Sequence, residues 1–312
     1  MHFRKVINLG KSSYVVSLPS SWTKKNNLKK GDIIRFFESK NNDLILSLND
    51  KPLGQKSNNV ETLNVDNKDI NRIRREIISA YIRGFNQLKI IGNVRENRDE
   101  IMAVLQDLIG TEIAEQGKTL ILANDIFDMK KFSINNSLRK MDIAVRNIFS
   151  EFKLFGNKDA YKNIEIYDSS TNRYMILFRR VYRSLLESGN SEGLGVNLSE
   201  VLNYWELSHH FERISFKLKT LYRSLSGVNN KKDVNSLLNF LEGVSEYYID
   251  VMKSYYSKDI DMAFHLADFK KMLMEKLDNT FKDNKNLQLG RCISTTHGLI
   301  LSIHKITRRV YD

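Results

Sequence analysis

The stretch that decides the fold of the N-terminal region is "GKSSYVVSLPSSWTKKNNLKKGDIIRF", residues 10–36. Its first apolar segment ends at Pro19, which lacks a backbone N–H donor and disfavours a helical conformation in the residue before it. The polar and basic residues that follow suit a short helix, with Ser20 or Ser21 as its N-cap. Lys-Gly-Asp is a turn signal before the next apolar segment. The sequence therefore predicts a strand, a proline stop, a basic helix, a turn and a second strand.

The residues around this stretch extend it to a small β-rich domain. Residues 3–48 contain short apolar segments separated by glycine and polar residues: "KVINL", "YVVSL", "DIIRFF" and "DLILSL". Segments of this length, rich in β-branched and aromatic residues, are typical of strands. We therefore expect four strands and one helix in a domain that covers residues 1–50. Pro52 and Gly54 lie in the polar segment 49–60, which has the composition of a linker.

Residues 60–128 have a different pattern, in which short strand-like segments alternate with amphipathic ones. "ETLNV" and "QLKIIG" are strand-like, and between them Ile70, Ile73 and Ile77 recur at helical spacing. A second helical segment, "RDEIMAVLQDLIG", precedes two strand-like segments that flank Gly117. This alternation predicts a small α/β domain that ends in a hairpin.

From residue 132 to 312 the strand pattern disappears and long amphipathic helices are expected. The clearest helix face consists of Leu207, Phe211, Ile214, Leu218, Leu221 and Leu225. Polar breaks divide the region into about six helices. "NKDAYKNIEIYD" and "SKDIDMAFHLAD" also correspond at an offset of 100 residues, with helices expected from Asn157 and Ser257. This correspondence predicts two three-helix repeats, at about 132–228 and 229–312.

The composition restricts the function classes. A net charge of +12 favours polyanionic partners, and residues 1–50 hold nine Lys and Arg residues against four acidic ones. Cys292 is the only cysteine, which excludes an intrachain disulfide and a zinc site of the CxxC type. The sequence contains no apolar N-terminal signal and no apolar stretch of 18 residues, so we expect a cytoplasmic protein without membrane insertion. Because nucleotide-binding and hydrolase motifs are absent, we do not expect an enzyme.

Two resemblances cover most of the chain. Leu18-Pro19, Trp22, Leu28 and Gly31-Asp32 fall in order on the signature of the AbrB/SpoVT (swapped-hairpin) DNA-binding domain. "HHFERISFKLKTL" is similar to a helix of the PhoU family, whose domains are tandem three-helix repeats. The whole chain resembles an archaeal phosphate-uptake regulator of the PhoU family with an N-terminal AbrB/SpoVT-like domain. The implied fold is multidomain α+β, with a swapped-hairpin β domain (1–50), a small α/β insert (60–128) and an all-α PhoU-like bundle of two three-helix repeats (132–312).

The first resemblance implies a homodimer whose basic surface binds double-stranded DNA. Its cationic side chains contact phosphates, and a few polar side chains contact bases. The alternative is an ordinary solvated surface. The lysines are expected at phosphates, and Arg4 is the expected base reader. The candidates for nucleic-acid contact are Arg4, Lys5, Lys11, Ser12, Ser13, Lys24 and Lys25.

The second resemblance raises the question of a metal site, because the PhoU pattern Glu-x-x-x-Asp places two carboxylates one helical turn apart. Here Phe216 stands where the pattern has Asp, which leaves Glu212 and, in the preceding helix, Asp168 as degenerate family positions. We therefore expect no metal cluster and no other cofactor. His209, His210 and Glu212 could form a residual metal site or be polar flanks of a packed helix, and the missing Asp favours the second interpretation.

Two functions of different classes fit these observations. One is a transcriptional regulator of phosphate uptake and homeostasis that binds DNA as a dimer. The other is a protein-interaction adaptor whose helical bundle modulates a phosphate-transporter ATPase or another regulatory protein. The arginines of "LFRRVYRSLL" (177–186), together with Arg308 and Arg309, could bind phosphate or an acidic partner, or simply keep the surface soluble.

Overall fold

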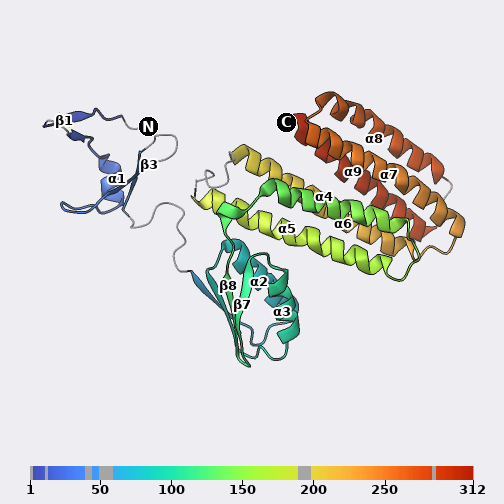
Figure 1. Ribbon diagram of the computed structural model, residues 1–312, viewed down its shortest axis with the longest axis horizontal. Coiled ribbons are helices and arrows are strands. Elements are labelled where there is room, and N and C mark those ends of the chain that lie inside the picture. Colours follow the sequence, from blue (N-terminus) through green and yellow to red (C-terminus); the bar gives the residue numbers. More distant parts are fainter. Residues whose placement is uncertain are drawn as a thin grey trace. The chain divides into compact units, whose positions relative to one another are not determined.

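The computed structural model describes residues 3–10, 13–38, 44–48, 59–188, 198–282 and 286–311. The chain divides into two compact units, Met1–Gln55 and Lys56–Asp312 (Figure 1). The predicted mixed α+β class is confirmed: a small β region at the N-terminus precedes a predominantly helical chain. No helix within the described residues has the length and apolar character that a membrane crossing requires.

The N-terminal unit consists of two short hairpins with a helix between them. Strand β1 pairs antiparallel with β2, and β3 pairs antiparallel with β4. Their bounds are β1 Ile7–Leu9, β2 Ser13–Val15, α1 Ser20–Lys25, β3 Arg35–Glu38 and β4 Leu44–Ser47. The predicted serine N-cap of α1 is wrong, because the helix begins at Ser20 and Pro19 is the N-cap, without a side-chain cap hydrogen bond. The N–H groups of Trp22 and Thr23 bond to the Pro19 carbonyl instead, each at 3.0 Å.

The turn before β3 explains the Lys-Lys-Gly-Asp sequence. The Asp32 carboxylate accepts a hydrogen bond from the Lys29 N–H at 2.7 Å, which closes the turn. Gly31 has a φ of 98°, a conformation that side-chain-bearing residues rarely adopt. Glycine and aspartate thus set the direction in which the chain enters β3.

The second unit begins with an α/β layer in which two helices cover one face of a four-stranded sheet. The strand order is β5-β6-β8-β7, with β5 and β6 parallel and the other pairs antiparallel. The bounds are β5 Val60–Asn64, α2 Ile70–Arg83, β6 Gln87–Ile91, α3 Arg98–Asp107, β7 Thr111–Gln116 and β8 Leu120–Asp125. Ile73 and Ile77 of α2 and Leu88 and Ile90 of β6 are buried. The predicted strands, helices and final hairpin are all present.

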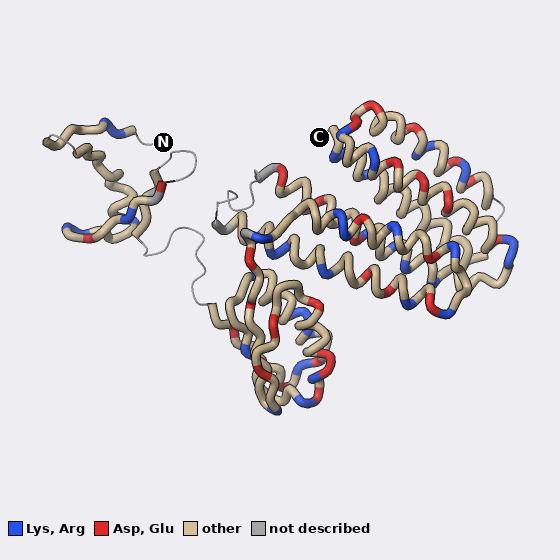
Figure 2. The backbone as a smooth tube through the Cα atoms, in the orientation of Figure 1, with Lys and Arg blue, Asp and Glu red and all other residues tan. Residues whose placement is uncertain are grey.

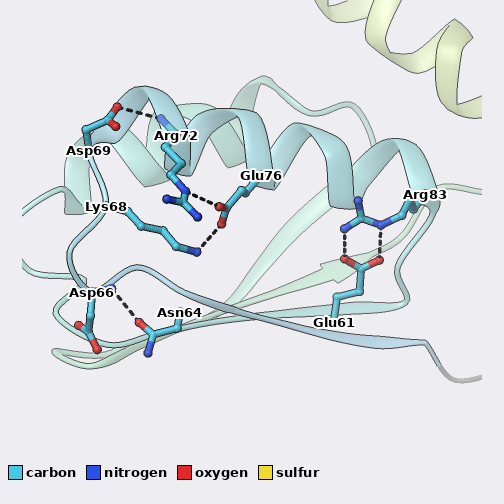
Figure 3. A network of polar contacts seen from close by, with 8 residues as sticks. All are labelled: Glu61, Asn64, Asp66, Lys68, Asp69, Arg72, Glu76 and Arg83. Carbon is cyan, nitrogen blue, oxygen red and sulfur yellow. Dashed lines mark hydrogen bonds and ion pairs between the residues drawn. The ribbon is translucent and has the colours of Figure 1, made fainter.

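A polar network fixes α2 on this sheet (Figure 3). The Asp69 side chain caps the helix by accepting from the Arg72 N–H at 3.0 Å. At the other end of α2, Nε and Nη2 of Arg83 donate hydrogen bonds to the two carboxylate oxygens of Glu61 on β5, at 3.1 and 2.6 Å (Figure 3). The helix is therefore held at both ends, because one bond caps its start and the other ties its last turn to the strand beneath.

The rest of the described chain forms a bundle of long helices (Figure 1). The helices are α4 Ile134–Phe152, α5 Ala160–Ser188, α6 Leu198–Leu225, α7 Lys231–Ser257, α8 Ile260–Thr280 and α9 Leu287–Tyr311. Helices α4, α5 and α6 pack on one another, as do α7, α8 and α9, and the two groups join mainly where α6 lies against α9. That the two groups are repeats of one unit stays a prediction.

The expected buried helix face is confirmed. Leu207, Phe211, Ile214, Leu218, Leu221 and Leu225 are all fully buried along α6. The two helix starts expected at Asn157 and Ser257 are each shifted, because α5 begins at Ala160 and α8 at Ile260. Asp259 caps α8 by accepting from the Met262 N–H at 2.9 Å. Cys292 is buried, and burial raises the pKa of its thiol to about 11, so it behaves as a small apolar residue.

Candidate nucleic-acid interface

Each predicted nucleic-acid residue that the structure describes is exposed in the N-terminal unit. Arg4 and Lys5 precede β1, Ser13 begins β2, and Lys24 and Lys25 form the last turn of α1. Lys11 and Ser12 lie outside the described residues.

The pairing of the first hairpin separates some of these candidates. Ser13 pairs with Leu9 beside the turn, whereas Lys5 lies two residues before Ile7, at the open end of the hairpin. Lys5 therefore lies outside the ladder, beyond the Ile7–Val15 pair, whereas Ser13 belongs to the pair at the opposite end. The structure therefore brings together Lys24 with Lys25 and Arg4 with Lys5, but it does not bring Ser13 to Arg4 and Lys5.

The charge of this surface is not internally neutralised. The described part of residues 1–50 contains seven Lys and Arg residues and two acidic residues. Figure 2 colours basic positions blue and acidic positions red. Among the described residues, Lys5, Lys24 and Lys25 have no carboxylate partner, and Arg4 donates only to the neighbouring Phe3 carbonyl, at 2.9 Å. Unpaired cations on one small domain are what phosphate contacts require.

Large apolar side chains of the same unit are exposed. None of its residues for which the structure describes burial is buried. Phe3, Ile33 and Tyr14 are 78%, 73% and 74% exposed. A hollow of about 480 Å³ lies between the start of α1 and β4, lined by Leu18, Pro19, Ser21, Trp22, Lys25 and Leu46. Exposed apolar surface on so small a unit marks an interaction face, because the unit cannot be stable without covering it.

Comparison with known proteins agrees with this description of the N-terminal unit. Residues 7–57 match a family model described as "Antidote-toxin recognition MazE, bacterial antitoxin". No curated protein and no solved structure matches the chain. The N-terminal unit therefore carries a MazE-type, AbrB-like domain. This finding supports the AbrB/SpoVT-like part of the sequence analysis.

Of the degenerate metal positions in the helical bundle, Asp168 belongs to an internal ion pair. The Asp168 carboxylate accepts from the Ser215 hydroxyl at 2.8 Å and pairs with the Lys219 ammonium. Burial, with Asp168 nearby, raises the pKa of Glu212, while the Phe216 ring is 55% exposed. The described residues contain no group of three or more His, Cys, Asp or Glu that could hold a metal ion. The sequence analysis missed Ser215 and Lys219, which lie one helical turn apart on α6.

Of the α5 arginines that the sequence left open as phosphate ligands, Arg180 forms a structural ion pair instead. Arg180 is buried and pairs with Asp125 at the end of β8, and its guanidinium lies 4.5 Å from the centroid of the Tyr81 ring. The neighbouring Arg179 is exposed. Arg180 is thus a structural link between the helical bundle and the α/β layer, and its pairing with a buried carboxylate explains how the fold tolerates a buried cation.

Proposed function

We propose that this protein is a DNA-binding transcriptional regulator that works as a homodimer through its N-terminal domain, and that it is not an enzyme. The observation that carries the proposal is a match to a MazE-type domain whose described residues include exposed apolar side chains, no buried one, and exposed lysines without acidic partners. A second copy covers the apolar face, and the paired domains present two sets of cations to one duplex.

The regulated process we propose is phosphate uptake and homeostasis. Support for this step comes from the similarity of the helical half to the PhoU family, carried by Glu212, Arg213 and Ile214 in "HHFERISFKLKTL". Fluorescence anisotropy with duplexes taken upstream of phosphate-transport genes tests it. Tighter binding to those duplexes than to duplexes of shuffled sequence is expected, and equal binding contradicts the regulatory target without contradicting DNA binding.

The DNA-binding surface is tested by reversing the charge of α1. The double variant Lys24→Glu/Lys25→Glu is expected to lose duplex binding at 100 mM salt. Because each phosphate contact adds about 0.9 to the slope of log K against log salt, any residual binding should have a slope smaller by about 2 to 4 in a dimer. Anisotropy titrations at several salt concentrations measure both quantities.

The matched control is Lys231→Glu/Lys232→Glu. These are also adjacent, exposed helix lysines, at the start of α7, and the charge change is identical. The control should bind DNA as the wild type does. Equal affinity of the α1 variant and this control contradicts the assignment of the surface.

A protein-interaction adaptor is the second candidate, and the description of the matching family, toxin recognition by an antitoxin, favours it. In that case the apolar face receives a different protein, and the helical bundle modulates a phosphate transporter or another regulatory protein. A wild-type chain that is monomeric and binds no duplex at 50 mM salt supports the adaptor over the regulator.

A further inference from the structure

A second cationic site lies in the helical bundle, in a pocket between α6 and α9 that we call the α6–α9 pocket. The two helices run antiparallel, because Arg309 near the end of α9 pairs with Glu206 near the start of α6, while Gln288 at the start of α9 reaches the Ser224 carbonyl. The pocket encloses about 390 Å³. Its basic lining residues are His209, His210, Arg213, Lys305, Arg308 and Arg309.

The charges around the α6–α9 pocket do not balance. Glu206 is its one acidic lining residue, and the ion pair with Arg309 neutralises it. Arg213, Lys305 and Arg308 are exposed and have no carboxylate partner among the described residues. Helix α9 contains no aspartate or glutamate at all. Three positive charges therefore converge on one hollow with no counter-charge from the described protein.

The helix dipole does not account for this arrangement. Basic residues in the last turn of a helix stabilise its carbonyl end, which explains Arg308 and Arg309. The dipole gives no reason for Arg213 to lie opposite them on α6, where one more cation repels the others. An anion bound among them removes that repulsion.

The histidines add neutral hydrogen-bonding groups to the cations. The Nδ1 atom of His210 is buried and has no hydrogen-bond partner among the described residues. Burial, with Lys305 and Arg309 nearby, lowers the pKa of His210 to about 4, so the ring is neutral at pH 7. A neutral imidazole can donate one N–H to an anion. Trp205 closes one wall, held edge-on against His209 at 4.6 Å and stacked on Tyr182 at 5.3 Å between ring centroids.

We propose that the α6–α9 pocket binds a small oxyanion with two or more negative charges, and that phosphorylated small molecules are its ligand class. The guanidinium groups of Arg213 and Arg308 match the paired oxygens of a phosphoryl group, and Lys305 supplies a third charge. A hollow of about 390 Å³ has the size of a small-molecule site. This site is separate from the DNA-binding surface, so the two proposals stand or fail independently.

Inorganic pyrophosphate is the probe for the test, titrated into the full-length chain by isothermal calorimetry at pH 7 and 100 mM salt. Saturable binding of one pyrophosphate per chain is expected. Arg308→Ala and Arg213→Ala should each weaken it at least tenfold. Arg291→Ala is the matched control, since Arg291 is another exposed arginine of α9 outside the pocket, and it should bind within twofold of wild type.

Two further arms make the outcome decisive. Citrate in place of pyrophosphate tests whether the pocket prefers phosphoryl groups to carboxylates. Tighter binding of citrate than of pyrophosphate contradicts the phosphoryl class. Lys24→Glu/Lys25→Glu should bind pyrophosphate normally, since its changes lie in the N-terminal unit. The proposal is overturned when pyrophosphate does not saturate the wild type, or when Arg308→Ala and Arg291→Ala bind it equally. Circular dichroism of all variants should match the wild type, because each changed side chain is exposed.

Discussion

At the scale of single residues, His304 is a buried titratable group that ties stability to pH. Its Nδ1 atom lies 3.2 Å from the Tyr247 hydroxyl and 3.4 Å from that of Thr307. Burial, with Lys270 and Arg308 nearby, lowers its pKa from 6.5 to about 4. Because the unfolded chain takes up the proton first, this histidine stabilises the fold above pH 6.5, and the contribution is lost as the pH falls toward 4.

The loss at pH 5 should be roughly 2 kcal/mol of unfolding free energy relative to pH 7.5. Urea unfolding of wild type and His304→Asn at the two pH values measures it, since asparagine cannot titrate. The variant should lose less stability on acidification by about that amount. The control is His265→Asn, a change at an exposed histidine of α8. It should lose as much unfolding free energy between the two pH values as the wild type does. Parallel pH dependence of His304→Asn and wild type would falsify this role.

Residue-level prediction from sequence succeeded where a local pattern carried the information. Leu207, Phe211 and Ile214 were expected in the core from spacing alone, and they are fully buried. The partners of Asp168 and Arg180 could not be found this way. Lys219 and Asp125 are 51 and 55 residues from them in sequence, and no local periodicity encodes contacts between different elements. The α6–α9 pocket also combines two helices, so the sequence showed its arginines but not their convergence.

At the scale of elements, a buried ion pair joins α5 to the sheet. The side chain of Asp125 is fully buried and that of Arg180 is 3% exposed, so each neutralises a charge that water cannot reach. Arg180 also lies against Phe127 at 5.4 Å from the ring centroid. Removing the cation alone leaves a buried carboxylate without its ion-pair partner, although the Phe127 N–H still donates to it at 3.1 Å. Breaking a buried ion pair in this way typically costs about 3 to 5 kcal/mol.

Arg180→Leu should therefore lower the unfolding free energy by about 3 kcal/mol. Arg179→Leu is the matched control, because Arg179 is the exposed neighbour on the same helix and should change stability by less than about 0.5 kcal/mol. Adding Asp125→Asn to Arg180→Leu should recover part of the loss, since it removes the buried charge. Chemical denaturation followed by circular dichroism compares the three. A stable single variant, or no recovery in the double variant, contradicts the role of the ion pair.

The elements themselves were largely predictable, and their ends were less so. The spacing of apolar residues predicts which segments are strands and which are helices, and Pro19 and Gly31 mark breaks between them. The N-cap of α1 was predicted at the wrong residue, because three consecutive residues, Pro19, Ser20 and Ser21, can each precede a helix. The backbone hydrogen bonds to the Pro19 carbonyl decide between them. The starts of α5 and α8 were each predicted three residues early, which reflects how weakly polar residues mark the first turn.

At the scale of the whole molecule, the N-terminal unit needs a partner surface to be complete. The sequence predicted its strands, but an incomplete core is a property of packing that no single segment reveals. Burying a side chain such as Leu46 or Trp22 contributes about 1.5 to 3 kcal/mol, and both line the 480 Å³ hollow. In the homodimer that we propose, a second copy of the chain supplies this burial twice, once for each protomer, through a symmetric interface.

The full-length wild type should therefore sediment as a dimer in analytical ultracentrifugation at micromolar concentration, and Leu46→Asp should shift it toward monomer by weakening self-association at least tenfold. The aspartate puts a charge into the hollow, where a second copy cannot hydrate it. Leu202→Asp is a matched control on α6, because the two leucines are similarly exposed, at 36% and 40%. It should remain as dimeric as the wild type. Since the DNA-binding cations are duplicated only in the dimer, Leu46→Asp should also weaken duplex binding. A monomeric wild type, or a Leu46→Asp chain as dimeric as Leu202→Asp, rules out the N-terminal unit as the dimer interface.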